Sequence, residues 1–207
     1  MPWRSRLPHR PPACLVAGTT ADGVLLDTAR GLDRWQLLEG CAQAAAIAGG
    51  DGAGGLLAAV SRVRFHRPAL PGERVAVAVE EGVSLGPLRQ VRIRIAGLID
   101  GELTIARAPA PPPVPWRDAP HAFDPSAAAA SFVGSFPASL PVFAGHFPGD
   151  PLVPAVYLLA LMERCAGAPV AGVARATFTR PVRPGEALSP EPGRIPGVCR
   201  AVFLTSG

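Results

Sequence analysis

Apolar and polar residues alternate with period two in three neighbouring segments of the chain. The segments cover residues 74–80, 89–95 and 102–107, and turn-forming residues separate them, including the pair Asp100-Gly101. Alternation over four to eight residues is typical of half-buried β-strands, and Asp-Gly between two such runs predicts a hairpin turn. In the second segment arginines alternate with aliphatic residues, so one face of that strand should be wet. The pattern predicts an antiparallel meander.

Two other segments are apolar on nearly every side and predict buried α-helices. The first covers residues 33–47, with Asp33 as its N-cap and glycines at positions 49 and 50 as its stop. The second covers residues 154–165, with Pro154 in its first turn and Gly167 after its end. We expect each helix to be wrapped by its own sheet.

A repeated segment identifies the chain as a tandem duplication. Residues 59–73 read AVSRVRFHRPALPGE, and residues 172–186 read GVARATFTRPVRPGE. Phe, Arg-Pro and Pro-Gly-Glu all recur at an offset of 113 residues. The proline-rich segment between the copies is typical of a stiff extended linker. We therefore predict a first domain over residues 1–108, a linker over 109–120 and a second domain over 121–207. After the second repeat there is room for about two strands, which would leave a sheet edge open.

Composition and charge argue against several classes of protein. The chain has 207 residues, 48% of them hydrophobic, and no apolar stretch of about 18 residues that would span a membrane. The net charge of +4 is mild, and the arginines are scattered, which argues against nucleic-acid binding. The four cysteines have neither a CxxC pair nor zinc-site spacing, so we expect buried free thiols. We expect a cytoplasmic protein.

Two residues in different halves are candidates for acid–base chemistry. Glu39 lies in the first apolar helix, with Gln43 one turn later and Trp35 one turn earlier on the same face. Its carboxyl group is either partly exposed or capping backbone, or an acid with a raised pKa that Gln43 orients. His146 lies in a loop rich in glycine and proline directly before the second helix. Its ordinary pKa, about 6.5, suits a base at neutral pH, although a single histidine is often structural.

The sequence around His146 resembles a family signature. Residues 145–154 read GHFPGDPLVP, which is similar to the Gly-His-Phe-Pro-Gly-x-Pro-x-x-Pro-Gly signature of bacterial 3-hydroxyacyl-ACP dehydratases of the hot-dog fold. The first half carries LPHR at 7–10 and LEGCAQ at 38–43, which also resemble this family. The resemblance implies an α+β fold, a double hot dog. Two tandem antiparallel sheets would each wrap a central helix, and each site would take its histidine from one copy and its acid from the other.

The departures from the family pattern are complementary in the two halves. The family places its acid fourteen residues after its histidine, and that position in the second half is Ala160. Fourteen residues before Glu39 lies Leu25, so the first half lacks the histidine. Glu163 is no simple replacement, because three residues along a helix move it about 60° around the axis. The chain thus resembles a fusion of the acid-bearing and His-bearing dehydratase subunits of aryl-polyene-type pathways, with one active site.

The resemblance implies an activity and a set of site residues. The activity is dehydration of a 3-hydroxyacyl-ACP thioester to the trans-2-enoyl thioester in fatty-acid or polyketide/polyene biosynthesis, without a metal or redox cofactor. His146 would be the base and Glu39 the acid. The backbone N–H of Ala155, where the family has glycine, would hold the thioester oxygen. The residues that the resemblance assigns to orientation and substrate binding are Gln43, Phe147, Gly149 and Pro154.

The expected partner is acyl carrier protein, whose phosphopantetheine would carry the substrate. Arg180 and Arg183 are candidates for docking this acidic protein. A homodimer and association with a ketosynthase are further possibilities. Two other functions stay open from the sequence. One is a non-catalytic hot-dog subunit that binds carrier protein or a catalytic partner, and the other is an acyl thioesterase.

Overall fold

The computed structural model describes residues 4, 7, 9–49, 54–108, 115–116 and 120–205, and most of the predicted linker lies outside them. The elements of the first half are β1 (Val16–Thr20), β2 (Gly23–Leu26), α1 (Arg34–Ala48), β3 (Gly54–Phe65), β4 (Ala76–Leu85), β5 (Leu88–Ile95) and β6 (Ile99–Ala108). The elements of the second half are α2 (Pro125–Ala130), the short 3-10 helix η2 (Pro141–Ala144), α3 (Ala155–Ala166), β7 (Val170–Phe178), β8 (Arg194–Ile195) and β9 (Cys199–Thr205).

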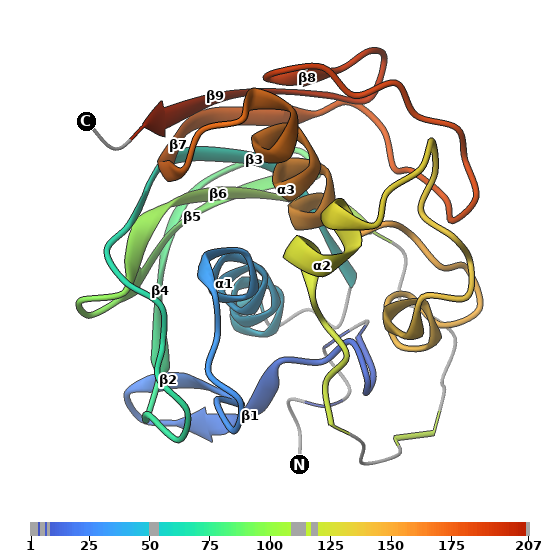
Figure 1. Cartoon of the computed structure of the whole chain (residues 1–207). Coiled ribbons are helices and arrows are strands. Elements are labelled where there is room, and N and C mark those ends of the chain that lie inside the picture. Colours follow the sequence, from blue (N-terminus) through green and yellow to red (C-terminus); the bar gives the residue numbers. More distant parts are fainter. Residues whose placement is uncertain are drawn as a thin grey trace.

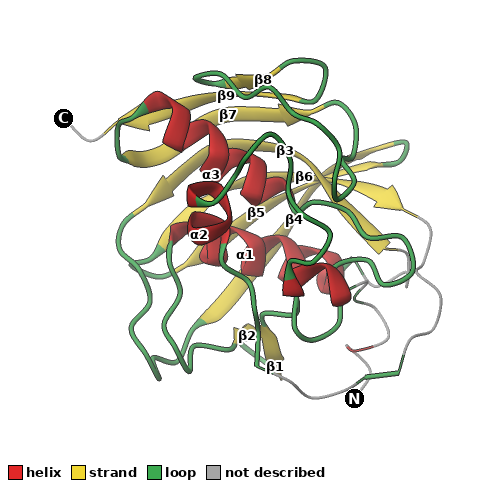
Figure 2. Cartoon of the chain, turned by 45° about the vertical axis from the view of Figure 1, so that its right-hand side comes forward, coloured by secondary structure: helices red, strands yellow, loops and turns green. Residues whose placement is uncertain are grey.

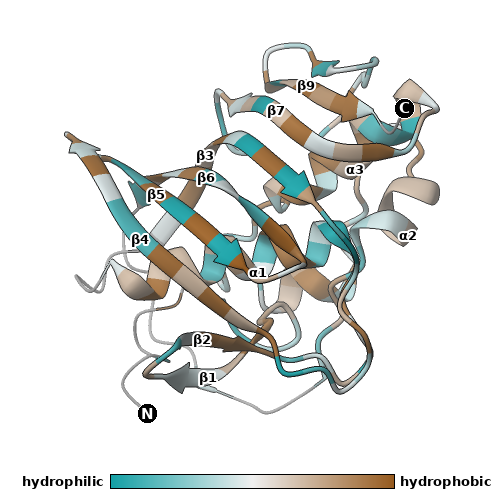
Figure 3. Ribbon diagram, turned by 90° about the vertical axis from the view of Figure 1, so that its left-hand side faces the viewer, coloured by the Kyte–Doolittle hydropathy of each residue, from teal (hydrophilic) through white to brown (hydrophobic). Residues whose placement is uncertain are grey.

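The described strands form one antiparallel sheet in the order β1-β2-β4-β5-β6-β3-β7-β9-β8. The sheet curves around α1 and α3, which lie on its concave side with α2 beside them (Figure 1). Figure 2 shows the same three helices crossing one face of the sheet. Along β5, Val91, Ile93 and Ile95 are buried, while Arg92 and Arg94 between them are exposed. Figure 3 shows the alternation of apolar and polar residues along this strand. The wet strand face predicted from the sequence is confirmed.

The pairing of β3 with β7 joins the two halves and has the symmetry of a dimer. Ala59 pairs with Thr177, and Arg64 pairs with Gly172. Adding the repeat offset of 113 to 59 gives 172, and adding it to 64 gives 177. Equivalent residues therefore exchange places across the join, as they do at a two-fold interface. The duplicated sequence folds as a pseudo-dimer, and the predicted double hot dog is confirmed.

The repeated Arg-Pro and Pro-Gly-Glu motifs form the same corner in both halves. In the first half Arg67 pairs with Glu73 at 2.7 Å, and Glu73 also accepts the backbone N–H of Leu70. In the second half Arg180 pairs with Glu186, which also accepts the backbone N–H of residue 183. In both halves the glutamate links the arginine side chain to the backbone of the turn, so the repeated motif has a structural role.

The helix boundaries follow the predicted signals, with one difference between the halves. Asp33 caps α1 by accepting the backbone N–H of Gln36 at 2.8 Å, and the Gln36 side chain bonds back to the Asp33 N–H. Gly167 ends α3 in the left-handed conformation, as glycine commonly does. Pro154 precedes α3 and supplies no side-chain hydrogen bond. The N-terminus of α3 is therefore left without the side-chain cap that α1 has.

Three expectations from the sequence are wrong. The turn between β5 and β6 lies at residues 96–98, where Gly97 has a positive φ, and not at Asp100-Gly101. Gly101 is a strand residue that allows close approach, because a Cβ there would lie 2.7 Å from the Cα of Val63. Cys165 is exposed, whereas Cys14, Cys41 and Cys199 are buried free thiols. The helices share one sheet, because the β3–β7 join makes it continuous.

The predicted two strands after the second repeat are present as β8 and β9. None of the helices within the described ranges is long and apolar enough to cross a membrane.

Candidate active site

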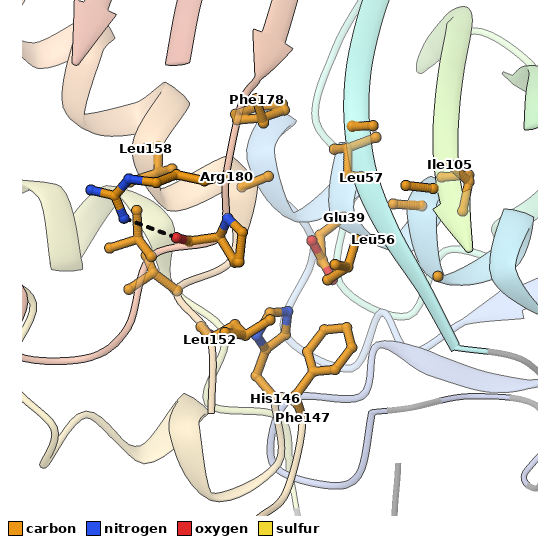
Figure 4. Close-up of a pocket in the computed structure, with 18 of the residues that line it drawn as sticks. Glu39, Leu56, Leu57, Ile105, His146, Phe147, Leu152, Leu158, Phe178 and Arg180 are labelled. Atoms are coloured by element: carbon orange, nitrogen blue, oxygen red, sulfur yellow. Dashed lines mark hydrogen bonds between the residues drawn. The ribbon is translucent and has the colours of Figure 1, made fainter. Parts of the chain in front are cut away.

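A cavity of about 210 Å³ lies where the two halves meet. Its walls come from α1, β3 and β6 of the first half and from the start of α3 and the segment after β7 of the second half. Leu57, Ile105 and Phe178 give the cavity a mostly apolar lining, and the Glu39 carboxyl group and the His146 imidazole face it from opposite halves (Figure 4).

Glu39 lies in the middle of α1 with 4% of its surface exposed. Gln43, one turn later, donates from Nε2 to Glu39 Oε1 at 3.0 Å and to the carbonyl of Ala13 at 2.9 Å. The Gln43 amide oxygen accepts the N–H of Leu15 at 2.9 Å, which fixes the amide orientation. Burial raises the pKa of Glu39 from 4.5 to about 7, and the Gln43 hydrogen bond opposes this rise. The Glu39 carboxyl group is thus mostly protonated below about pH 7, and Gln43 orients it.

His146 lies in the loop between η2 and α3 and is 5% exposed. Its Nδ1 is 2.6 Å from the carbonyl oxygen of Leu152, which can only accept, so Nδ1 carries the proton and Nε2 has a free lone pair. Burial lowers the pKa of His146 from 6.5 to about 4, although the bond to Leu152 favours the charged form. The imidazole is therefore neutral and basic at Nε2 near neutral pH.

The pKa values of Glu39 and His146 are shifted in opposite directions. Burial favours the protonated form of the Glu39 carboxyl group and the unprotonated form of the His146 imidazole. One carboxylate oxygen of Glu39, one ring nitrogen of His146 and one ring nitrogen of His9 lie within 4.8 Å of one another. Two histidines and a glutamate are also the donor set of some zinc sites, so a divalent metal ion is chemically compatible with this cluster. A neutral base and a protonated acid in one cavity suit the transfer of one proton from a substrate and of another to it.

His9 is a site residue that the sequence did not single out. It is 4% exposed, lines the cavity, and places Nε2 at 3.4 Å from Glu39 Oε1. Its ring lies 4.7 Å from the ring of His146. The signal was present in the Leu-Pro-His-Arg sequence at 7–10, of which residue 8 lies outside the described residues. No pattern within that short segment indicated which distant residues it would contact.

The N-terminal segment reaches the site by pairing with the His146 loop. His9 and His146 form an antiparallel β-bridge, and the Arg10 N–H donates to the Gly145 carbonyl at 2.8 Å. Gly145 is required at this crossing, because a Cβ there would lie 2.0 Å from the carbonyl oxygen of Arg10. Phe147 follows with φ of 55°, an uncommon conformation for a bulky residue, and its ring packs edge-on against both histidines.

The backbone N–H of Ala155 belongs to the first residue of α3, and Ala155 lines the cavity. The first four N–H groups of a helix have no acceptor within the helix, and the helix N-terminus favours negative charge. Pro154 leaves this end of α3 without a side-chain cap, whereas Asp33 caps the equivalent end of α1. The uncapped helix end at the cavity is therefore suited to an oxyanion.

The other residues proposed from the sequence have different positions. Phe147 lines the cavity, but Gly149 and Pro154 do not; Gly149 is an exposed turn residue with positive φ, and Pro154 is buried before α3. Arg180 lines the cavity (Figure 4), and Arg183 lies nearby on the surface. Both guanidinium groups are neutralised by acids, Arg180 by Glu186 and Arg183 by Asp150 at 2.6 Å. Docking of a carrier protein by these arginines stays a prediction.

The pseudo-two-fold symmetry of the two halves relates the cavity to a second, equivalent position. Side chains occupy that second position. Counted from the helix N-caps, Ala160 in α3 takes the place of Glu39 in α1. In the same way Arg34 takes the place of Ala155, and Glu163 takes the place of Ala42. Ala42 and Ala155 line the cavity. Arg34 and Glu163 form an ion pair at 3.1 Å.

Trp35 completes the filling of that position. Its Nε1 donates to Glu163 Oε2 at 2.8 Å, and its ring packs edge-on against Phe65 and Phe203. The second position therefore has Ala160 in place of the acid, and the side chains of Arg34, Trp35 and Glu163 occupy it. Glu163 has a structural role there.

Part of the second half of the chain is similar to known proteins. Residues 124–191 match the family described as ApeI-like, ApeI dehydratase, and the match includes His146. This part of the chain is similar to dehydratases. The 3-hydroxyacyl-[acyl-carrier-protein] dehydratase FabZ of Chlamydia trachomatis serovar L2 is 36% identical over 64 residues, which cover 24% of this chain and 42% of that protein. The same enzyme of serovar D gives the same values.

The chain thus spans less than half of the length of these curated relatives. Among solved structures, RV0216 of Mycobacterium tuberculosis, a conserved hypothetical protein described as having a double hotdog fold, is 16% identical with a TM-score of 0.33. That likeness covers 71% of this chain and 72% of the other. The region that matches the family begins at residue 124, after Glu39, and ends at residue 191. The pairing of Glu39 with His146 therefore rests on the geometry of the site.

Proposed function

We propose that the chain dehydrates a (3R)-3-hydroxyacyl thioester, carried on the phosphopantetheine of acyl carrier protein, to the trans-2-enoyl thioester. One observation carries the proposal: Glu39 and His146, from different halves, face one cavity with pKa values shifted in opposite directions. The likeness of the second half to dehydratases supports the reaction type. The apolar cavity lining supports an acyl chain as the bound group.

In the proposed reaction, His146 Nε2 removes a proton from Cα of the substrate. The electron pair moves toward the thioester carbonyl, whose oxygen accepts a hydrogen bond from the Ala155 N–H at the N-terminus of α3. Protonated Glu39 gives its proton to the β-hydroxyl group, the Cβ–O bond breaks, and water leaves as the Cα–Cβ double bond forms. The site is reset when the proton gained by His146 is lost and Glu39 takes up another.

The test is a dehydration assay on the purified chain with a 3-hydroxyacyl carrier protein, read as loss of water by mass spectrometry. We expect His146→Ala and Glu39→Gln each to lower kcat by roughly 10²–10⁴-fold, because each removes one proton-transfer group. Matched controls are His66→Ala and Glu80→Gln, which change the same residue types on exposed positions outside the cavity and should leave the rate unchanged.

Three results would contradict the proposal. The first is wild-type turnover by both site variants. The second is free acid instead of enoyl product, which would indicate a thioesterase. The third is tight binding of the acyl carrier without any turnover, which would indicate a non-catalytic subunit. A homodimer and association with a ketosynthase stay predictions.

A further inference from the structure

His9 is the buried polar group beside the site that the proposed reaction does not use. Its side chain lines the same cavity as Glu39 and His146, and neither ring nitrogen has a hydrogen-bond partner among the described residues. Burying a polar group without a partner destabilises a protein, and an apolar side chain would fill the same space without that cost. The position of the imidazole is therefore informative.

The His9 ring lies beside the acid of the proposed pair. His9 Nε2 lies 3.4 Å from Glu39 Oε1, the oxygen that also accepts the Gln43 hydrogen bond. A protonated carboxyl group has one oxygen that accepts and one that carries the proton. Gln43 already donates to Oε1, and a second N–H donor there would make Oε1 the accepting oxygen and leave the proton on Oε2.

Resting on the dehydratase function proposed above, we infer that His9 is a positioning residue for the acid. Its Nε2–H interacts weakly with Glu39 Oε1 in the free chain, and this contact tightens into a hydrogen bond when substrate fills the cavity, so that His9 and Gln43 together hold the transferable proton on Oε2. The same two donors then stabilise the carboxylate that remains after transfer. The separation of 3.4 Å is longer than a well-formed bond, and catalytic hydrogen bonds often tighten only when substrate is bound.

The surroundings of His9 favour this role over that of a second base. Burial first, then electrostatic repulsion from His146 and from Arg10, holds the pKa of His9 well below its ordinary value, so its imidazole is neutral. It therefore acts on Glu39 as a hydrogen-bond donor and not as a cation. The base role suits His146, because its bond to Leu152 fixes which nitrogen is free.

Few other ionisable groups face the pair. Among the described residues they are His146 from the loop before α3, Arg10 from the N-terminal segment, Tyr157 from α3 and Arg180 from the segment after β7, which is paired with Glu186, while β3 and β6 contribute apolar residues to the cavity wall. A change in the titration of Glu39 on substitution of His9 alone is thus traceable to their mutual contact.

The experiment compares His9→Phe, which removes the donor but fills the space, with His9→Gln, which keeps an N–H donor. The ionisation of Glu39 is followed by the infrared carbonyl band of its protonated carboxyl, identified by subtraction of Glu39→Gln spectra. We expect His9→Phe to raise the pKa of Glu39, because the carboxylate loses a donor, and to move the alkaline limb of kcat to higher pH. We expect kcat to fall about 10- to 100-fold with KM little changed, and His9→Gln to restore most of both.

A folded His9→Phe variant with the wild-type titration of Glu39 would overturn the inference. If that variant does not fold, His9→Gln and His9→Ala are compared in the same way. An equal pKa of Glu39 in these two variants would also overturn the inference. The spectroscopic titration needs no turnover. A wild-type chain that fails to dehydrate would therefore refute the proposed function, while the titration still decides the role of His9.

Discussion

Gly145→Ala adds one methyl group at the crossing of the N-terminal segment and the His146 loop. The new Cβ would lie 2.0 Å from the Arg10 carbonyl oxygen and 2.7 Å from the Ala13 nitrogen. Both are backbone atoms, so the two segments must separate by about 1 Å to reach ordinary contact distances. Gly145 has φ of −119°, which alanine also adopts, so the effect is steric and not conformational.

The separation breaks the Arg10–Gly145 hydrogen bond and moves His146 relative to Glu39. A misplacement of about 1 Å in a catalytic group can cost about 10²-fold in rate. Forcing atoms into a packed site typically costs about 1–3 kcal/mol, and at roughly 2–4 °C per kcal/mol Tm should fall by about 2–12 °C. The assays are kcat/KM for dehydration and calorimetric unfolding.

Gly18→Ala is the matched control, because no atom lies within 4 Å of a Cβ built at that position. It should leave the rate and Tm close to wild type. The reasoning is refuted if Gly145→Ala and Gly18→Ala behave alike in both assays, since the crossing would then have room for a methyl group.

Three further predictions concern the acid. The rate kcat/KM should rise with pH through about 4, as His146 becomes neutral, and fall above about 7, as Glu39 ionises; a profile flat across both values would contradict the assignment. Folding raises the pKa of Glu39 from 4.5 to about 7, so wild type should lose on the order of 3 kcal/mol of stability as pH rises across that range, and Glu39→Gln should not. Parallel denaturant-midpoint curves for the two proteins would show that Glu39 is not buried as described. Ala160→Glu should add no activity to Glu39→Gln and should lower Tm, because Arg34 and Trp35 fill the space beside it; recovered dehydration would refute the filled second position.

Much of the fold could be predicted because it depends on local signals. Asp33, Gly167 and the Pro-Gly corners act on their own neighbours, and the alternation along β5 reports directly which face is buried. The duplication also predicted a pseudo-dimer, since two copies of one fold commonly pair about a two-fold axis. The prediction of a turn at Asp100-Gly101 was wrong because Gly101 lies in a strand, where the lack of a side chain allows the close approach of Val63, a residue far away in the sequence.

The site was predictable only in part, for the same reason. Glu39 and His146 are unusual in their own segments, so each stands out from the sequence. His9 lies in a short segment without periodicity, and its meaning comes from the crossing at Gly145. Gly149 and Pro154 belong to the same motif as His146, but they shape the loop and the helix start without lining the cavity. A motif therefore predicts which residues occur together and not which of them contact a substrate.

The self-complementary register of β3 and β7 also has a stoichiometric consequence. A homodimer built from first halves would contain two acids and no base of the His146 type, and one built from second halves would contain two bases and no acid. Covalent linkage keeps the ratio of acid to base at one to one, and it sets their effective concentration by the tether and not by expression level. Each cavity wall is also present once per chain, so a substitution in either half alters one side of one site and leaves the opposite wall unchanged.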